Sequence, residues 1–208
     1  MNKLFLELAL AGGDWVLVLL LLASIASVAV MYERWRVFRA NRSRTDDLVR
    51  VITERLDAGD GKGALESIRD FNNLEGRVAM AGLERFSMGA DAVEEVLAGA
   101  LVRERVLLEK RLIILGTLGN NAPFVGLFST VLGIIKAFND LAVTGSSGVS
   151  VVMAGISAAL VATAFGILVA IPAVIANNYF HTRLEEMVAS AERVSHLLMA
   201  YLRKSSRG

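Results

Sequence analysis

The side chains best placed to do chemistry in this chain are neutral hydroxyls within long uncharged stretches. Thr130, Ser157 and Thr163 lie in segments that contain no Asp, Glu, Lys or Arg. A hydroxyl can both donate and accept a hydrogen bond, so each of these side chains can form a polar position on a wall within the membrane. Alternatively, each threonine hydroxyl bonds the backbone carbonyl one turn back in its own helix. The residues alone leave both interpretations open.

Composition excludes most other chemistry. The 208 residues include no Cys, which excludes disulfides, thiolate metal sites and a thiol nucleophile. The two histidines, His181 and His196, do not form a ligand-like cluster. A net charge of +1, from 22 basic and 21 acidic residues, argues against nucleic-acid binding. We therefore expect no enzyme activity, no metal and no other cofactor.

Three uncharged windows define the elements that must position the hydroxyls. Residues 15–32 and 112–135 carry no charge, and neither do residues 141–180, which begin with a Gly/Ser-rich segment. A membrane-spanning helix needs about 20 apolar residues. Three such windows in one chain favour membrane spans over buried helices of a soluble protein. We predict spans at 15–32, 112–135 and 149–180, with a loop at 136–148.

Basic residues indicate the orientation of these spans. Five arginines follow the first window, at positions 34, 36, 39, 42 and 44. The positive-inside rule then places residues 33–111 and 181–208 in the cytoplasm and the N-terminus outside. The basic cluster follows the apolar stretch instead of preceding it, which is not the order of a cleavable signal. Residues 1–14 are predicted to hold a short interfacial helix, at about 2–13, on the outer side.

The two segments predicted to be cytoplasmic, residues 33–111 and 181–208, have the sequence pattern of helices with apolar seams. Residues 33–111 are rich in helix formers and in charges of both signs, and glycines divide them into short helices. We predict that the last of these runs without a break into the second span at Leu112. The third span should likewise continue into residues 181–208, with one apolar seam at Leu184, Val188, Ala191, Val194, Leu198 and Tyr201. That seam packs either against the chain's own helices or against another subunit.

The predicted fold class is thus an all-α membrane protein with three transmembrane helices, two of which extend as long helices into a cytoplasmic helical bundle. Small residues are dense in the third span, which indicates close helix packing. The two prolines, Pro123 and Pro172, fall within the second and third spans, where each removes a backbone hydrogen bond.

Two motifs on these spans resemble a known family. The sequence PFVGLFSTVLGII, at 123–135, resembles the second-span signature of the ExbB/TolQ/MotA proton-channel family. The sequence GISAALVATAFG at 155–166, followed by AIPAV at 170–174, is similar to the third-span signature. The three-span plan is closer to ExbB and TolQ than to the four-span flagellar stator.

The resemblance implies a motor subunit of the bacterial inner membrane, with a periplasmic N-terminus and a cytoplasmic C-terminus. Five copies would form a ring that contacts the membrane lipid. Two copies of a single-span ExbD- or TolR-like protein would occupy the central pore and supply the titrating Asp, and a TonB- or TolA-like protein would receive the work. Thr130 and Thr163 match the family's pore-facing threonines. The motif positions that would shape the spans are Pro123, Gly126, Gly133, Gly155, Gly166 and Pro172.

One departure from the family pattern bears on function. Where the family commonly has Glu in the third span, this chain has Ala158, next to Ser157. The subgroup relies on the partner's Asp and the threonines, or the alanine is an engineered change, or the chain does not conduct. The implied function is to energise TonB-dependent transport at the outer membrane with the proton motive force. The alternatives are a TolQ-like or gliding-motor subunit, or a non-conducting scaffold.

Overall fold

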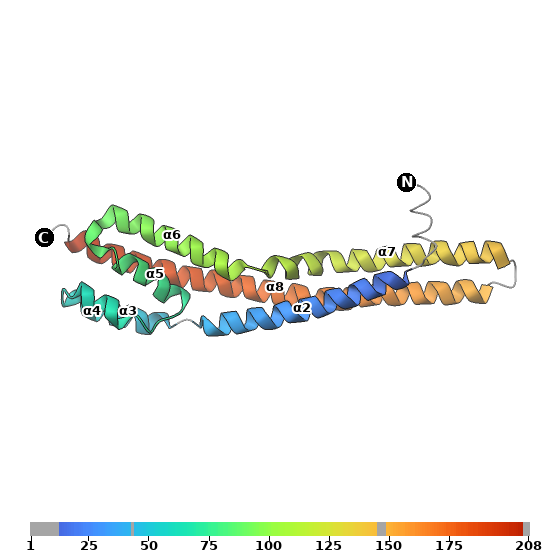
Figure 1. The fold of residues 1–208 in the computed structure, drawn as a ribbon, viewed down its shortest axis with the longest axis horizontal. Coiled ribbons are helices and arrows are strands. Elements are labelled where there is room, and N and C mark those ends of the chain that lie inside the picture. The colour runs from blue at the N-terminus through green and yellow to red at the C-terminus, as the bar shows by residue number, and fades with distance from the viewer. Residues whose placement is uncertain (1–12, 43, 145–148, 206–208) are drawn as a thin grey trace. The chain divides into compact units, whose positions relative to one another are not determined.

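The computed structural model describes residues 13–42, 44–144 and 149–205, and within these ranges the chain is helical, with no strand (Figure 1). This confirms the all-α prediction for the described part of the chain. The predicted interfacial helix at 2–13 lies almost entirely outside it, as do residues 145–148 of the predicted loop. The elements in order are α2 (Asp14–Ala40), α3 (Thr45–Asp57), α4 (Gly61–Ser67), α5 (Leu74–Leu83), the 3-10 helix η1 (Phe86–Met88), α6 (Ala90–Glu109), α7 (Leu112–Thr144) and α8 (Val149–Ser205).

Three helices, α2, α7 and α8, are long and apolar enough to cross a membrane. The chain divides into two compact units, and α2 and α8 each contribute to both. We call residues up to 33 together with 111–178 the apolar unit, and residues 34–110 together with 179–208 the charged unit.

In the apolar unit, α7 and α8 pack side by side, and α2 lies against them (Figure 1). The buried cluster where the three helices meet includes Leu20 of α2, Leu132 of α7 and Val169 of α8. Many other large apolar side chains of this unit are exposed, among them Phe124 and Leu168. An exposed apolar surface of this kind is what lipid or another subunit must cover.

The charged unit buries apolar side chains along the C-terminal part of α8. The seam residues Leu184, Val188, Ala191, Val194 and Leu198 are all buried, and only Tyr201 of the predicted seam stays partly exposed. Gly82 of α5, Leu97 of α6 and Leu198 of α8 meet at one point. The seam therefore packs against the chain's own helices, which decides between the two interpretations left open by the sequence.

The prediction of an unbroken helix from the charged segment into the second span is wrong. Helix α6 ends at Glu109 and α7 begins at Leu112. Between them, Lys110 adopts an extended ψ of 130° and Arg111 a left-handed φ of 70°. Non-glycine residues rarely adopt positive φ, and neither Gly nor Pro marks the break. The Arg111 guanidinium pairs with Glu33 at 3.0 Å.

A second difference concerns the end of α7. Residues 136–144, predicted as part of a loop, continue the helix to Thr144. Lys136 and Asp140 therefore lie one turn apart on α7. Helix α8 fits its prediction, since it begins at Val149 and continues as one helix through residue 205.

Candidate functional site

The contact between α7 and α8 is built from glycines that leave no room for a side chain. Gly119, Gly126 and Gly133 recur every seven residues and so lie on one face of α7. A Cβ on Gly126 would lie 2.9 Å from the carbonyl oxygen of Ala162, and one on Gly133 would lie 2.6 Å from the Cβ of Ala159. The backbones of the two helices therefore approach each other directly along this face.

Helix α8 contributes glycines to the same contact. A Cβ on Gly166 would lie 2.6 Å from the carbonyl oxygen of Ala122, and one on Gly155 would lie 3.0 Å from the Cβ of Ala137. The contacts Gly166–Ala122 and Gly155–Ala137 run in opposite directions along the two helices, as expected for an antiparallel pair. All four motif glycines that the sequence singled out thus lie at the α7–α8 contact.

Thr163 uses its hydroxyl to join the two helices. Its Oγ1 donates a hydrogen bond to the carbonyl oxygen of Gly126 at 2.9 Å. The bond is possible because Gly126 has no side chain and its backbone reaches the Cα of Thr163. The alternative in which this hydroxyl bonds its own helix is therefore wrong for Thr163. The side chain is part-buried, and its lone pairs can still accept hydrogen bonds.

Thr130 behaves differently. Its Oγ1 donates to the carbonyl oxygen of Leu127 at 2.7 Å, one turn back in α7, and the residue is 8% exposed in the isolated chain. The own-helix alternative thus holds for Thr130. Its neighbour Ser129 is fully buried and donates to the carbonyl oxygen of Gly13 at 3.3 Å. The two threonines singled out together therefore have different local roles.

A cavity of about 290 Å³ lies beside Ala158, the position at which the resemblance implies Glu. Ala158 lines it, and Lys136 and Asp140 of α7 supply its charges. The other α8 residues that line it are also small: Ala154, Gly155, Ala159 and Ala162. Ser157 is exposed and does not line the cavity. A long side chain at position 158 would have space that the alanine leaves open.

The two prolines lie inside helices that continue past them. Pro123 is within α7 and Pro172 within α8, so both helices retain their course despite the missing backbone donor. Pro172 is exposed and Pro123 only partly so. Among the described residues there is no group of three or more His, Cys, Asp or Glu side chains that could hold a metal ion.

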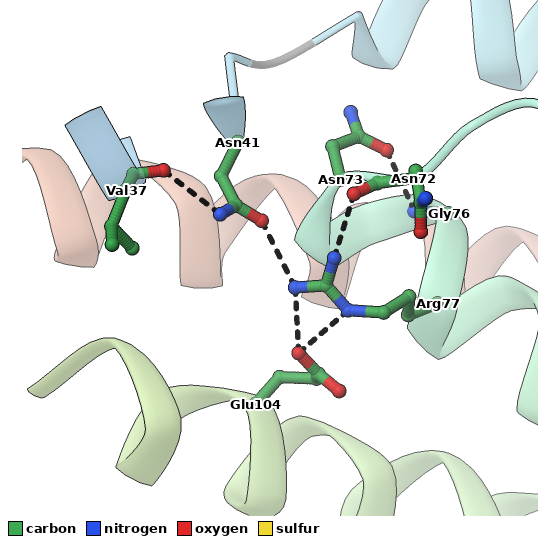
Figure 2. A network of polar contacts seen from close by, with 7 residues as sticks. All are labelled: Val37, Asn41, Asn72, Asn73, Gly76, Arg77 and Glu104. Carbon is green, nitrogen blue, oxygen red and sulfur yellow. Dashed lines mark hydrogen bonds and ion pairs between the residues drawn. The ribbon is translucent and has the colours of Figure 1, made fainter. Parts of the chain in front are cut away.

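A polar network in the charged unit was not foreseen from the sequence (Figure 2). The Arg77 guanidinium of α5 donates to Glu104 of α6, with its Nη2 2.7 Å and its Nε 2.8 Å from Glu104 Oε2. The same guanidinium donates to the side-chain oxygen of Asn41 at 2.9 Å and to the carbonyl oxygen of Asn72 at 2.7 Å. Asn41 in turn donates to Val37 of α2.

This network fixes three segments that are distant in sequence. Glu104 is 6% exposed, so its charge depends on Arg77 for compensation. Nothing in the sequence distinguishes these two residues from the many other charged residues between 33 and 111. A partner for Arg77 could be named only after the packing of α5 on α6 was known.

Comparisons with known proteins agree with these features. Residues 70–193 match the MotA/TolQ/ExbB proton channel family. The chain is 34% identical over 184 residues to the Tol-Pal system protein TolQ of Pseudomonas aeruginosa, covering 83% of this chain and 80% of that protein. It is 28% identical over 227 residues to the biopolymer transport protein ExbB of Xanthomonas campestris pv. campestris, and that alignment covers 99% of this chain and 89% of that protein.

A third relative, the Tol-Pal system protein TolQ of Haemophilus influenzae, is 31% identical to this chain over 198 residues. The alignment covers 86% of this chain and 85% of that protein. The matched region contains both polar spans, the Arg77–Glu104 pair and most of α8. The chain belongs to the MotA/TolQ/ExbB proton channel family. Its relatives include proteins named TolQ and ExbB, and the resemblance inferred from the two span motifs is confirmed.

Proposed function

We propose that this chain forms the wall of a proton-driven motor in a bacterial inner membrane, and that it couples the proton motive force to work in the cell envelope. Five copies would form a ring, and two copies of a single-span ExbD- or TolR-like partner would occupy the pore. The observation that carries the proposal is the close contact of α7 with α8, in which the Thr163 hydroxyl is hydrogen-bonded to the carbonyl of Gly126, within the region matched by the family.

The proposed topology has residues 1–14 and 136–148 on the periplasmic side and residues 33–111 and 181–208 in the cytoplasm. It rests on the arginines that follow the first span. Because α7 continues to Thr144, the periplasmic segment starts as a helical extension that carries Lys136 and Asp140. The charged unit is then the cytoplasmic domain.

Thr163 is the residue that we expect to interact with the partner's titrating carboxyl group. While its proton is held by the carbonyl of Gly126, the hydroxyl can accept a hydrogen bond from a carboxylic acid. To donate to a carboxylate, it must release that carbonyl. The same side chain therefore has one arrangement for each protonation state. Each proton that crosses supplies about 2.3 kcal/mol per 100 mV of membrane potential.

The other positions have supporting roles in the proposal. Ser157 is exposed on α8 and can offer a further hydroxyl to the pore. Thr130 reaches the pore only if its hydroxyl leaves the carbonyl of Leu127. Ala158 cannot ionise, so the titrating group must come largely from the partner. An uncompensated charge in an apolar pore is costly, which gives the partner's Asp a reason to seek hydroxyls when charged.

The output could serve either of two systems. An ExbB-like subunit would energise TonB-dependent transport at the outer membrane, and a TolQ-like subunit would act with a TolA-like protein in envelope maintenance. Relatives of both names match over most of the chain, so they support the two outputs equally. A gliding motor is a further variant of the same mechanism. The competing class is a non-conducting scaffold, and Ala158 is the observation that favours it.

The test compares Thr163→Val with Thr163→Ser in cells that express the partner. Valine keeps the shape and removes the hydroxyl, whereas serine keeps the hydroxyl. We expect the valine variant to lose energised work and the serine variant to retain most of it, while both copurify with the partner. Normal energised work in the valine variant would exclude Thr163 from the pathway. Loss of copurification would instead assign the residue a role in assembly.

A further inference from the structure

A groove of about 690 Å³ lies in the charged unit, between the end of α2 and the middle of α8. Its floor includes Phe38 and Phe180, whose ring centroids are 5.1 Å apart and which are both buried. This aromatic contact holds the two helices together at the groove. The proposed function does not use any of these residues.

Each helix contributes an aromatic ring with an arginine four residues later. On α2, the guanidinium of Arg39 lies over the ring of Trp35, 5.1 Å from its centroid. On α8, the guanidinium of Arg183 lies over the ring of Tyr179 at 5.6 Å. The two rings are about half exposed, so the pairs flank an open groove and are not part of the core. Stacking orders the arginines while leaving N–H donors available.

The groove has an excess of positive charge. Arg39, Arg42 and Arg183 line it, and Glu186 is the one acidic residue among the lining residues. Glu186 accepts from Arg183 at 2.8 Å. A hydrogen bond with Tyr179, and then one with Glu186, raises the pKa of Arg183, so it stays charged. Neither Arg39 nor Arg42 forms a salt bridge within the described residues.

The position of the groove in the sequence indicates where it lies relative to a membrane. Trp35 comes three residues after the uncharged stretch 15–32, and Tyr179 is next to the last residue of the stretch 141–180. Aromatic and arginine residues at the ends of apolar helices are typical of the level of lipid headgroups. The groove therefore opens where the two spans leave the hydrocarbon region.

We propose that this groove binds the phosphate of an anionic phospholipid in the cytoplasmic leaflet. The inference rests on the topology given under the proposed function. Arg39, Arg42 and Arg183 donate to the phosphodiester oxygens, and the exposed rings of Trp35 and Tyr179 contact the glycerol and the upper acyl chains. Glu186 opposes the anion and limits the affinity. An acidic protein segment would match the charge but would not need rings at the boundary of two spans.

The test uses the fluorescence of Trp35 in the full chain. Trp15 and Trp35 are the two tryptophans, so Trp15→Phe leaves Trp35 as the only reporter. The protein is reconstituted in phosphatidylcholine vesicles that contain brominated phosphatidylglycerol or brominated phosphatidylcholine, and quenching gives the relative affinity of the two lipids at Trp35. We expect phosphatidylglycerol to be preferred by about five-fold or more, because each arginine near the surface favours an anionic lipid by about five-fold.

Charge variants of opposite sign sharpen the test. Arg39→Gln combined with Arg183→Gln should reduce the preference to nearly one, and Glu186→Gln should increase it. Arg105→Gln is the matched control, because Arg105 is an exposed arginine of α6 paired with Glu109 and lies outside the groove. It should leave the preference unchanged. Proton flux with the partner is measured on the same variants, and it should persist when the preference is lost.

The remaining outcomes each decide against the proposal. Equal quenching by the two brominated lipids would overturn the proposal. An acidic protein segment would then be the better candidate ligand for the arginines. Displacement of phosphatidylglycerol by inorganic phosphate, but not by chloride at equal ionic strength, would show a site for the free anion instead of the lipid. A preference that survives loss of both arginines would reflect general surface charge. Because quenching is measured without the partner, failure of the motor function would not alter this readout.

Discussion

The two units of this molecule achieve close packing by different means. In the apolar unit, α7 and α8 meet through Gly126 and Gly166, whose missing side chains let the backbones touch. In the charged unit, α5, α6 and α8 pack large apolar side chains such as Leu97 and Leu198, and the Arg77–Glu104 pair lies beside that core.

The difference follows from the solvent expected for each unit. Between helices in lipid there is no hydrophobic driving force, so association depends on close van der Waals contact and interhelical hydrogen bonds. In water, burial of apolar side chains supplies most of the stability. The backbone contact of α7 with α8 therefore requires small side chains, whereas the core around α8 in the charged unit is built mainly from large ones, and variants can be chosen to test that contrast.

The largest effect is expected from adding a methyl group at Gly166. In Gly166→Ala, the new Cβ would lie 2.6 Å from the carbonyl oxygen of Ala122, a backbone atom that cannot move independently. We expect α7 and α8 to separate, at a cost of about 3 kcal/mol or more, because overpacking against a fixed backbone atom falls at the upper end of the usual range. Thermal unfolding of the purified protein in detergent measures the change.

Gly99→Ala is the matched control for this variant. Gly99 lies within α6, and a Cβ there meets nothing within 4 Å. Alanine should stabilise the helix by about 1 kcal/mol because it has the higher helix propensity. Equal destabilisation by both alanines would contradict the contrast between the units.

A smaller loss is expected when the ion pair of the charged unit is broken. Arg77→Met leaves the nearly buried carboxylate of Glu104 without its partner, and it removes the bonds to Asn41 and Asn72. Loss of one member of a buried pair costs about 3–5 kcal/mol, and less here because the Arg77 side chain is 33% exposed. We expect chemical unfolding to show that the free energy of unfolding falls by about 2 kcal/mol relative to the unchanged protein.

The double variant Arg77→Met with Glu104→Met shows whether the loss comes from the unpaired charge. Because the unpaired carboxylate is then absent, the double variant should be more stable than Arg77→Met alone. Arg105→Gln, at an exposed pair with Glu109, should change stability by less than about 1 kcal/mol. If the double variant proved less stable than Arg77→Met alone, the unpaired charge would not be the source of the loss, and the network itself would contribute net stability.

The smallest effect concerns the pH dependence of a surface contact. The Tyr201 hydroxyl donates to Asp57 at 2.8 Å, and this hydrogen bond raises the pKa of Tyr201 above its ordinary value near 10. A raised pKa in the folded state means that the contribution is present below about pH 10 and is lost as pH rises through the folded value. Tyr201→Phe should therefore lower the melting temperature slightly at pH 8. The difference from the native chain should vanish above the folded pKa, and a difference that persists there would argue against the Asp57 bond as its source.

The sequence was informative where helical periodicity and charge carried the signal. The start of α7 at Leu112, the start of α8 at Val149 and the burial of the α8 seam all follow from patterns of apolar and charged residues. Periodicity could not reveal the break at Arg111, because the left-handed backbone occurs at a residue type that normally continues a helix.

The candidate site shows the same division. The motifs singled out Thr130 and Thr163 together, yet one bonds its own helix and the other bonds α7 from α8. That distinction depends on which backbone carbonyl lies within hydrogen-bonding distance of each hydroxyl. The carbonyl of Gly126 lies close enough to Thr163 only when α7 and α8 are packed together. The Arg77–Glu104 pair could not be foreseen for a similar reason, since it joins residues from two helices whose contact fixes the geometry.

The central claim is that this chain supplies the wall and its partner supplies the titrating group. Proton flux into proteoliposomes, driven by a membrane potential, tests it directly when the chain alone is compared with the complex of chain and partner. We predict flux only with the complex, and its loss when the partner's Asp is replaced by Asn. Flux through the chain alone, or no flux through an intact energised complex, would contradict the account.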